Sequence, residues 1–161
     1  MDTPDADADR PRVVVGLDDS IGARAALRYA LGEARRDGAT VDAVAVYVSP
    51  ERFAVLARVP IVAERAQVAA ATEAAARAVV DEVLAADRVE HPGRDLPPVT
   101  VRAVPGDPGP ALGAAGDGAA RLVVGHRGRG AVATGLLGSV GWWCLRHAPC
   151  PLTVVPAAAT A

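Results

Sequence analysis

Residues Val123–Gly141 read VVGHRGRGAVATGLLGSVG, the most informative stretch of the chain. It begins as a short apolar strand, continues as a glycine-rich loop and opens a helix near Ser139. Gly125, Gly128 and Gly130 permit positive φ angles and a close approach of the backbone, so successive amides can point into one concavity. The amino end of the following helix favours an anion. The stretch therefore predicts a strand–loop–helix unit whose loop binds an anion.

The side chains of this loop indicate phosphate as the anion. Arg127 and Arg129 carry forked guanidinium groups suited to phosphate oxygens, and Ser139 adds a hydroxyl donor. We expect His126 to act through its backbone amide and Arg129 through its side chain. The chain contains no lysine, which excludes a P-loop lysine and a lysine Schiff base. A polyphosphate site without lysine is one interpretation, and a glycine-rich turn with a purely structural role is the other.

Apolar runs alternate with helical patterns on either side of this stretch. Val13, Val14 and Val15 form an unbroken apolar run, which is typical of a strand buried on both faces of a parallel sheet. The alternation predicts a doubly wound α/β domain with helices on both faces of the sheet. Strands are expected at Arg12–Leu17, Thr40–Val48, Val99–Val104, Arg121–Val124 and Leu152–Val155.

The segments between these strands carry the helical patterns. The first helix is expected to begin after Asp18-Asp19-Ser20 and to end at Asp37-Gly38. Residues 49–59 are expected to form a connection, with Pro60 in a first helical turn. The remaining helices are expected over a long segment marked by Val68, Ala75 and Val79 that ends near Arg88, over a short weak segment opened by Gly106-Asp107-Pro108, and from Ser139 to His147.

The length of 161 residues corresponds to one ordinary domain. Residues 1–10 are acidic and poor in apolar side chains, so we expect a disordered leader. Residues 11–156 form the expected folded domain, and residues 157–161 a frayed tail.

The composition of the chain argues against several classes of protein and of site. A net charge of −2 speaks against binding nucleic acid by counterion release, and no run of 18 apolar residues is present to span a membrane. Two cysteines are too few for a disulfide framework and indicate a cytoplasmic protein. Cys144, His147 and Cys150 are three residues apart, but structural zinc normally takes four ligands, so we expect no metal there. Of the neighbouring Trp142 and Trp143, we expect one to be buried and the other half exposed.

In a doubly wound sheet, ligands bind beyond the carboxyl ends of the strands at the switch point. That rule places a site at the ends of the first and fourth strands. Asp18 lies there and is expected to contact a ligand, although a carboxylate in this position can also serve only as a helix cap. Ser20 is the expected cap.

The spacing of Gly125, two residues, Gly128, nine residues and Gly138-Ser139 resembles the universal stress protein family, in its ATP-binding branch. The resemblance covers residues 12–155. It also rests on VVVGLDDS at the first strand, VPGDP before the short helix and APCPLTVV before the last strand.

The resemblance implies a Rossmann-like sheet of five parallel strands in the order 3-2-1-4-5, paired into homodimers through the last strand, Leu152–Val155. It implies ATP binding, with Mg²⁺, rather than a defined metabolic reaction. Asp18 would lie by the ribose or adenine, Gly16 beneath the base, and Val48 would contact adenine through its backbone. The ribose and phosphates would be wrapped by Val124, Gly125, His126, Arg127, Gly128, Arg129 and Gly130, and the β- and γ-phosphates held by Gly138, Ser139 and Val140.

The chain departs from the family pattern at a few positions. Asp19 stands where these proteins usually have glycine and adds a negative charge near the nucleotide. Gly141 removes a hydroxyl that could touch phosphate, and Trp142-Trp143 is bulky for an outer helix. Arg121, where an acidic residue is common, is expected to be a surface substitution.

Two functional hypotheses remain open. The first is a non-catalytic, nucleotide-responsive homodimer with a regulatory or stress-protective role. The second is a slow ATP hydrolase or phosphotransferase, although near the loop we expect only Asp18 and Asp19, with no positioned Glu, Gln or Lys to orient a nucleophile. A flavin-binding domain is a weaker third possibility, because aromatic residues make up only 3% of the chain.

Overall fold

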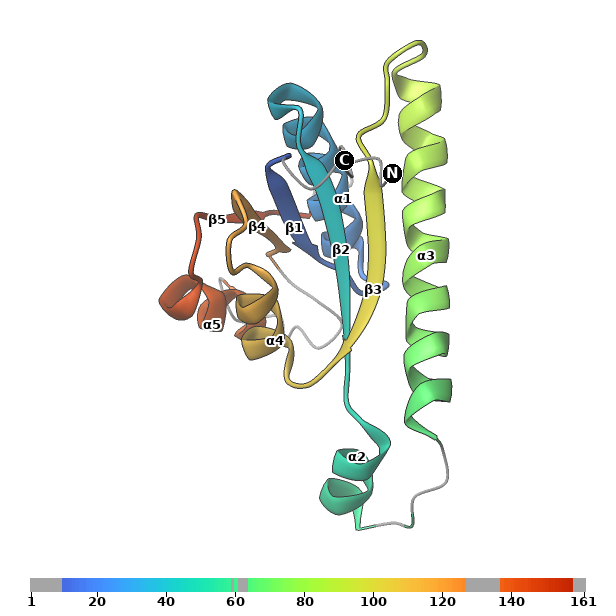
Figure 1. Ribbon diagram of the computed structural model, residues 1–161, viewed down its shortest axis with the longest axis vertical. Helices are drawn as coiled ribbons and strands as arrows, with labels where there is room; N and C mark the ends of the chain where they lie inside the picture. The colour runs from blue at the N-terminus through green and yellow to red at the C-terminus, as the bar shows by residue number, and fades with distance from the viewer. Residues whose placement is uncertain (1–9, 59, 61–63, 127–136, 158–161) are drawn as a thin grey trace, which may run out of the picture.

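The computed structural model describes residues 10–58, 60, 64–126 and 137–157. They form a parallel five-stranded sheet in the order β3-β2-β1-β4-β5 with helices on both faces (Figure 1), which confirms the expected fold. Apart from residues 10 and 157, the expected leader and tail lie outside the described residues. The elements are β1 (Arg12–Gly16), α1 (Ile21–Asp37), β2 (Thr40–Tyr47), α2 (Pro50–Ala57), α3 (Arg65–Glu90), β3 (Val99–Pro105), α4 (Pro108–Ala115), β4 (Arg121–Gly125), α5 (Ser139–His147) and β5 (Leu152–Val155).

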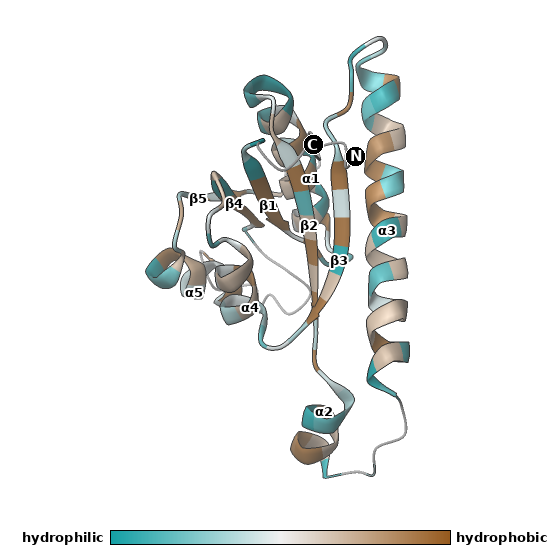
Figure 2. Cartoon of the chain, in the orientation of Figure 1, coloured by the Kyte–Doolittle hydropathy of each residue, from teal (hydrophilic) through white to brown (hydrophobic). Residues whose placement is uncertain are grey.

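The apolar run of β1 explains the two-layered core. Successive side chains of a strand point to opposite faces, so Val13 and Val15 pack under α1 and α3 while Val14 packs under α4 and α5. All three side chains are buried. Figure 2 shows this central strand as predominantly hydrophobic.

The ends of α1 follow directly from local sequence. Ser20 is the N-cap, and its Oγ accepts a hydrogen bond from the Ala23 amide at 3.1 Å, as expected. Gly38 ends the helix in the left-handed conformation, with φ of 63°. Between them, Leu27 and Leu31 are fully buried against the sheet.

The segment expected to be a plain connection contains a helix, α2. Ser49 caps it, its Oγ accepting a hydrogen bond from the Arg52 amide at 3.4 Å, and Pro50 occupies the first turn. Pro50 therefore has the role expected of Pro60. Figure 1 shows α2 standing off from the sheet, and its Phe53 is 58% exposed.

The side chain of Trp143, in α5, packs against α4. A Cβ added at Gly109 or Gly113 would lie 2.7 or 2.6 Å from atoms of the Trp143 ring, so both positions must lack a side chain. Gly113, which lowers the helix propensity of α4, is thus required by packing. Trp142 is 55% exposed, as expected of one of the two tryptophans, whereas Trp143 is only partly buried, against the α4–α5 core, rather than fully buried.

Ion pairs anchor the amino ends of the strands. Buried Asp42 accepts hydrogen bonds from Arg12 at 3.0 Å and from Arg102 at 2.9 Å. The bond to Asp42 raises the pKa of Arg102 against the opposing effect of burial. Arg121 pairs with Glu33, which is 9% exposed, so the expectation of a mere surface substitution was wrong.

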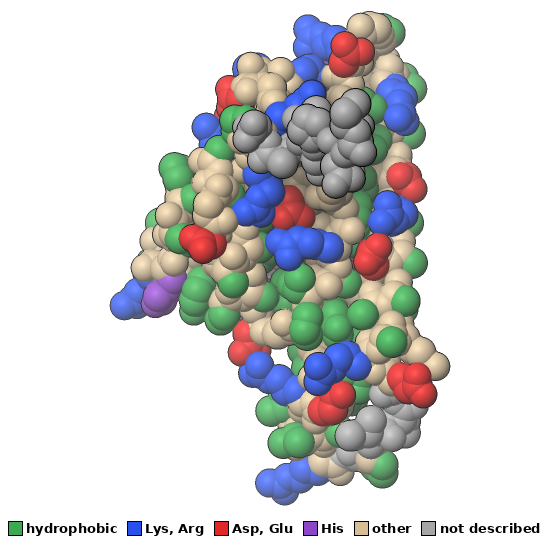
Figure 3. Space-filling view, in the orientation of Figure 1, with side chains coloured by type: hydrophobic (Ala, Val, Ile, Leu, Met, Phe, Trp, Pro, Cys, Tyr) green, Lys and Arg blue, Asp and Glu red, His purple; other side chains and the backbone are tan. Residues whose placement is uncertain are grey.

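On the face of the molecule drawn in Figure 3, positive and negative side chains are interspersed, and neither sign forms a patch of its own.

The described helices include none with the length and apolarity that a membrane span requires. In the described part of the chain, no group of three or more His, Cys, Asp or Glu side chains is arranged to hold a metal ion.

The two cysteines are expected to differ in reactivity. Both are free thiols; Cys144 is completely buried, and burial raises its pKa to about 11, while burial also raises the pKa of the half-buried Cys150. Because the thiolate is the nucleophile, alkylation of the folded protein at pH 8 should modify Cys150 well before Cys144. Mass spectrometry of iodoacetamide-treated protein, with Cys150→Ser as the control, measures this. Equal labelling rates in the folded protein would contradict the buried position of Cys144.

Candidate nucleotide site

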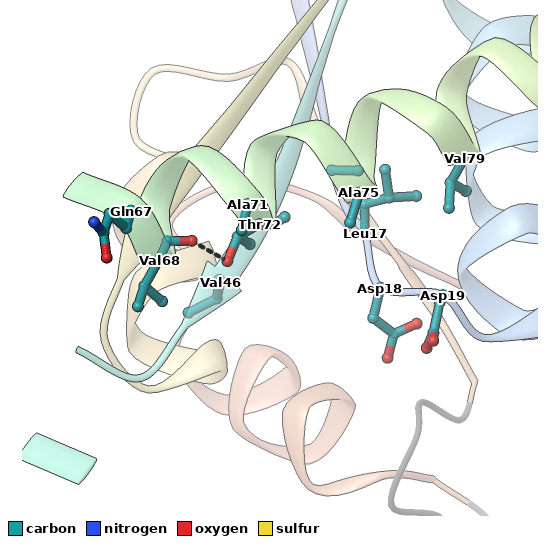
Figure 4. Close-up of a pocket in the computed structure, with 12 residues that line it drawn as sticks. Leu17, Asp18, Asp19, Val46, Gln67, Val68, Ala71, Thr72, Ala75 and Val79 are labelled. Atoms are coloured by element: carbon teal, nitrogen blue, oxygen red, sulfur yellow. Dashed lines mark hydrogen bonds between the residues drawn. The ribbon is translucent and has the colours of Figure 1, made fainter. Parts of the chain in front are cut away.

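A pocket of about 470 Å³ lies between α3 and the carboxyl ends of β1 and β2 (Figure 4). Its volume falls within the roughly 300–1,000 Å³ typical of small-molecule sites. It is lined by Leu17, Asp18, Asp19, Ala45, Val46, Gln67, Val68, Ala71, Thr72, Ala75, Ala76 and Val79. It lies at the carboxyl edge of the sheet, where a doubly wound fold binds its ligands, but beside β1 and β2, whereas the site was expected at the ends of β1 and β4.

Two carboxylates form the acidic end of the pocket. Asp18 and Asp19 follow β1 directly, and Figure 4 shows their carboxylates side by side and pointing in the same direction. One oxygen of Asp18 accepts a hydrogen bond from the Ser20 amide at 2.9 Å. Leu17, just before them, donates its amide to the Val44 carbonyl at 2.9 Å. Asp18 therefore both shapes the turn into α1 and lines the pocket.

The middle of the pocket is apolar. Val46 of β2 forms one wall, and Val68, Ala71 and Ala75 of α3 form the other (Figure 4). Because the alanine side chains extend only a short way from the helix backbone, they leave room in the pocket for a planar group. Such a slot suits an aromatic ring, which gains dispersion and hydrophobic contact on both faces.

Helix α3 also places two polar residues, Gln67 and Thr72, in the lining of the pocket. The sequence had not predicted either of them as a site residue. The expectation that no positioned Glu, Gln or Lys lies near the glycine-rich loop stays a prediction. Thr72 donates its hydroxyl to the Val68 carbonyl at 2.8 Å. Gln67 precedes Ala71 and Ala75 at intervals of four residues, a spacing that places it on their helix face and could have identified it.

The carboxyl end of β4 lies next to the start of α5. The His126 amide donates to the Val155 carbonyl at 2.7 Å, and the Gly138 amide donates to the His126 carbonyl at 3.1 Å. The two ends of the glycine-rich loop are therefore held together and tied to β5. Ser139 is exposed at the first turn of α5, and Val140 behind it is half-buried.

Four expected site residues of this loop, Arg127, Gly128, Arg129 and Gly130, lie outside the described residues.

Three further expected site residues do not line the pocket. A Cβ at Gly16 would lie 2.7 Å from Leu112 of α4, on the sheet face opposite α3. Val124 is 3% exposed within the same α4–α5 core, and Val48 is 41% exposed just beyond β2. Their contacts with a ligand stay predictions, which for the buried Val124 would involve the backbone.

Two glycines near the site have clear packing roles. A Cβ at Gly125 would lie 2.6 Å from the backbone carbon of Gly22, so the end of β4 meets the start of α1 backbone to backbone. A Cβ at Gly141 would lie 2.6 Å from Leu137. The close packing of Leu137 thus explains why residue 141 has no side chain, and therefore no hydroxyl that could contact phosphate.

A family model described as the universal stress protein family matches residues 10–156. The chain belongs to the universal stress protein family. The match spans nearly the whole chain and confirms the resemblance seen in its motifs. None of the curated proteins matches this chain.

Solved structures of universal stress proteins share the fold. One, solved in complex with cAMP, is 25% identical with a TM-score of 0.62 and covers 92% of this chain and 98% of its own. A family protein from Burkholderia pseudomallei is also 25% identical, with a TM-score of 0.59 and coverages of 92% and 97%. A third, from Archaeoglobus fulgidus in complex with dAMP, is 20% identical with a TM-score of 0.56 and coverages of 91% and 97%.

Proposed function

We propose that this universal stress protein binds ATP, with Mg²⁺ on the phosphates, and acts as a cytoplasmic, nucleotide-responsive homodimer with a regulatory or stress-protective role. The observation that carries the proposal is the pocket of about 470 Å³ at the carboxyl ends of β1 and β2, apolar in the middle and acidic at one end. Nucleotides bound by the two solved relatives, cAMP and dAMP, support an adenine ligand.

The pocket suits the nucleoside part of ATP. Adenine would lie in the slot between Val46 and Ala71, where both of its faces meet apolar groups. The ribose would lie at Asp18, because a carboxylate accepts hydrogen bonds from sugar hydroxyls. Gln67 supplies an amide that can both donate to and accept from polar atoms at the edge of the base.

The phosphates would lie at the start of α5, bound by Gly138, Ser139 and Val140 together with the loop that begins at Gly125. Gly138 is the N-cap of α5 and has no side chain to satisfy the first-turn amides, which leaves these donors for an anion. Mg²⁺ prefers oxygen ligands, which the phosphates would supply, and the carboxylate of Asp18 would be a further oxygen ligand.

The edge strand β5 would carry the homodimer. It lies at the end of the sheet order, and an open strand edge can pair with a second copy. The hydrogen bonds from His126 to Val155 and from Gly138 to His126 join the phosphate-binding segment to this edge. They supply a short covalent and hydrogen-bonded path by which a bound nucleotide could change the dimer surface.

A slow ATP hydrolase or phosphotransferase is the second candidate, and the presence of Gln67 in the pocket favours it more than the sequence did. Glutamine can orient an attacking water in phosphoryl transfer. Gln67, however, comes from the part of α3 beside Val68, at the far end of the lining from the two carboxylates (Figure 4). That position is better suited to the base than to the phosphates.

Isothermal titration with ATP and Mg²⁺ tests the proposal. We expect saturable binding, with turnover well below 1 s⁻¹. Steady-state turnover above roughly 1 s⁻¹, within the ordinary enzyme range, would favour the enzyme instead. Absence of binding at millimolar ligand would contradict both candidates. Sedimentation velocity with and without ATP measures the homodimer and its response.

A further inference from the structure

Helix α2 carries its larger apolar side chains on the outside. Phe53, Val55 and Leu56 are 58%, 77% and 68% exposed, whereas the residues that the helix buries are the smaller Pro50 and Ala54. Figure 2 shows a hydrophobic turn in this helix, which stands off from the sheet. Single apolar residues scattered over a surface are ordinary, but a group of them on one short helix marks an interaction surface. We call these three exposed side chains the α2 patch.

A helix as short as α2 needs packing to be stable. It has only eight residues, and its inward face supplies only the two small buried side chains. Isolated helices of this length are marginal in water, and most helical stability in proteins comes from the packing of an apolar face. The α2 patch has more apolar surface to remove from water than the inward face, so it is the face that gains most from a partner.

Two ion pairs fix the direction in which the α2 patch points. Arg52 pairs with Asp107, the N-cap of α4, at 2.8 Å. Glu51 pairs with Arg65, the first residue of α3, at 3.4 Å. These contacts tie the first turn of α2 to two other elements and hold its buried face inward. The α2 patch is therefore presented to a second molecule.

The two ends of α2 carry opposite charges. Glu51 lies in the first turn, and the exposed Arg58 is the C-cap. If two copies of the helix pack antiparallel about a two-fold axis at its middle, Phe53 of one copy opposes Leu56 of the other. The same axis places Glu51 of each copy opposite Arg58 of the other, because both pairs are centred on the same point of the helix. Such a contact is isologous, with apolar groups at its centre and opposite charges at both ends.

We propose that the α2 patch is a self-association surface, on which α2 of a second copy of this chain packs antiparallel. The surface is separate from β5, because α2 follows β2, and β5 lies at the far end of the sheet order from β3 and β2. The inference therefore depends neither on nucleotide binding nor on the β5 homodimer. A contact made by one short helix from each copy is small, so this association depends on protein concentration. Together with a β5 homodimer it would join dimers into larger assemblies.

Sedimentation velocity from micromolar to millimolar protein tests the proposal. The weight-average sedimentation coefficient of wild type should rise with concentration. Leu56→Asp should lower the association constant by at least about tenfold, because it places a charge in the apolar contact. Val89→Asp is the matched control, since Val89 is 82% exposed near the end of α3 and lies outside the α2 patch. This variant should associate as wild type does.

A charge exchange tests the antiparallel arrangement independently. Arg58→Glu and Glu51→Lys should each weaken self-association, because like charges then meet at both ends of the contact. An equimolar mixture of the two variants should restore it, because each end of one variant then meets an opposite charge on the other. High salt should reduce both effects, since salt screens exposed charges.

Three results would overturn the inference. One is a wild-type sedimentation coefficient that does not change with concentration. Another is a rise that Leu56→Asp leaves intact, which would assign the association to a surface such as β5 and leave the proposed homodimer standing. The third is a mixture of the two charge variants that associates no better than either variant alone, which would contradict the antiparallel contact between two α2 helices.

Discussion

Gly125→Ala is expected to lower the free energy of unfolding by about 3 kcal/mol, the upper end of the usual cost of overpacking a core. The added methyl would lie 2.6 Å from the backbone carbon and 2.7 Å from the oxygen of Gly22. Backbone atoms at the start of α1 cannot move aside as a side-chain tip can. The strand end and the helix start must therefore separate, at the point where the glycine-rich loop begins and where the turn that contains Asp18 enters α1.

Gly32→Ala is the matched control for this prediction. Gly32 lies inside α1, and a Cβ there meets no atom within 4 Å. This variant should stabilise the protein by about 0.5–1 kcal/mol, because alanine has the higher helix propensity. Urea unfolding measures both variants. A Gly125→Ala midpoint equal to that of wild type would contradict the close approach of β4 and α1.

Ala71→Trp is expected to weaken the binding of ATP with Mg²⁺ by roughly tenfold or more, the equivalent of at least about 1.4 kcal/mol. Ala71 lines the apolar slot from α3, and an indole there would occupy the space proposed for adenine. The residue is exposed, so the substitution should change stability little. Isothermal titration measures the affinity.

Ala70→Trp is the control for Ala71→Trp. Ala70 is exposed on the same helix, one residue earlier, and points about 100° away from Ala71 and off the pocket. It should bind ATP as wild type does. Equal affinities for all three proteins would show that the nucleotide does not use the slot.

Much of the fold could be predicted because its signals are local. Val13–Val15 predict a strand buried on both faces, Ser20 the start of a helix and Gly38 its end. The sheet order, by contrast, was implied only by the family resemblance, and the structure confirms it. Strand order depends on contacts between distant segments, which periodicity does not reveal.

The features that the sequence did not predict were missed for physical reasons. Helix α2 has a cap at Ser49 and a proline at the first turn, but its Phe53 is exposed, so it lacks the buried apolar face that periodicity detects. Arg121 finds its partner Glu33 88 residues away, beyond the reach of any local pattern. Gln67 shares a helix face with Ala75, but only the placement of α3 over the strand ends shows that this face lines a pocket.

The most direct measurement is a crystal structure of the protein grown with ATP and Mg²⁺. We expect adenine between Val46 and Ala71, the ribose within hydrogen-bonding distance of Asp18, and phosphates at the amides of Ser139 and Val140. A nucleotide bound elsewhere on the protein, with this pocket left to water, would contradict it.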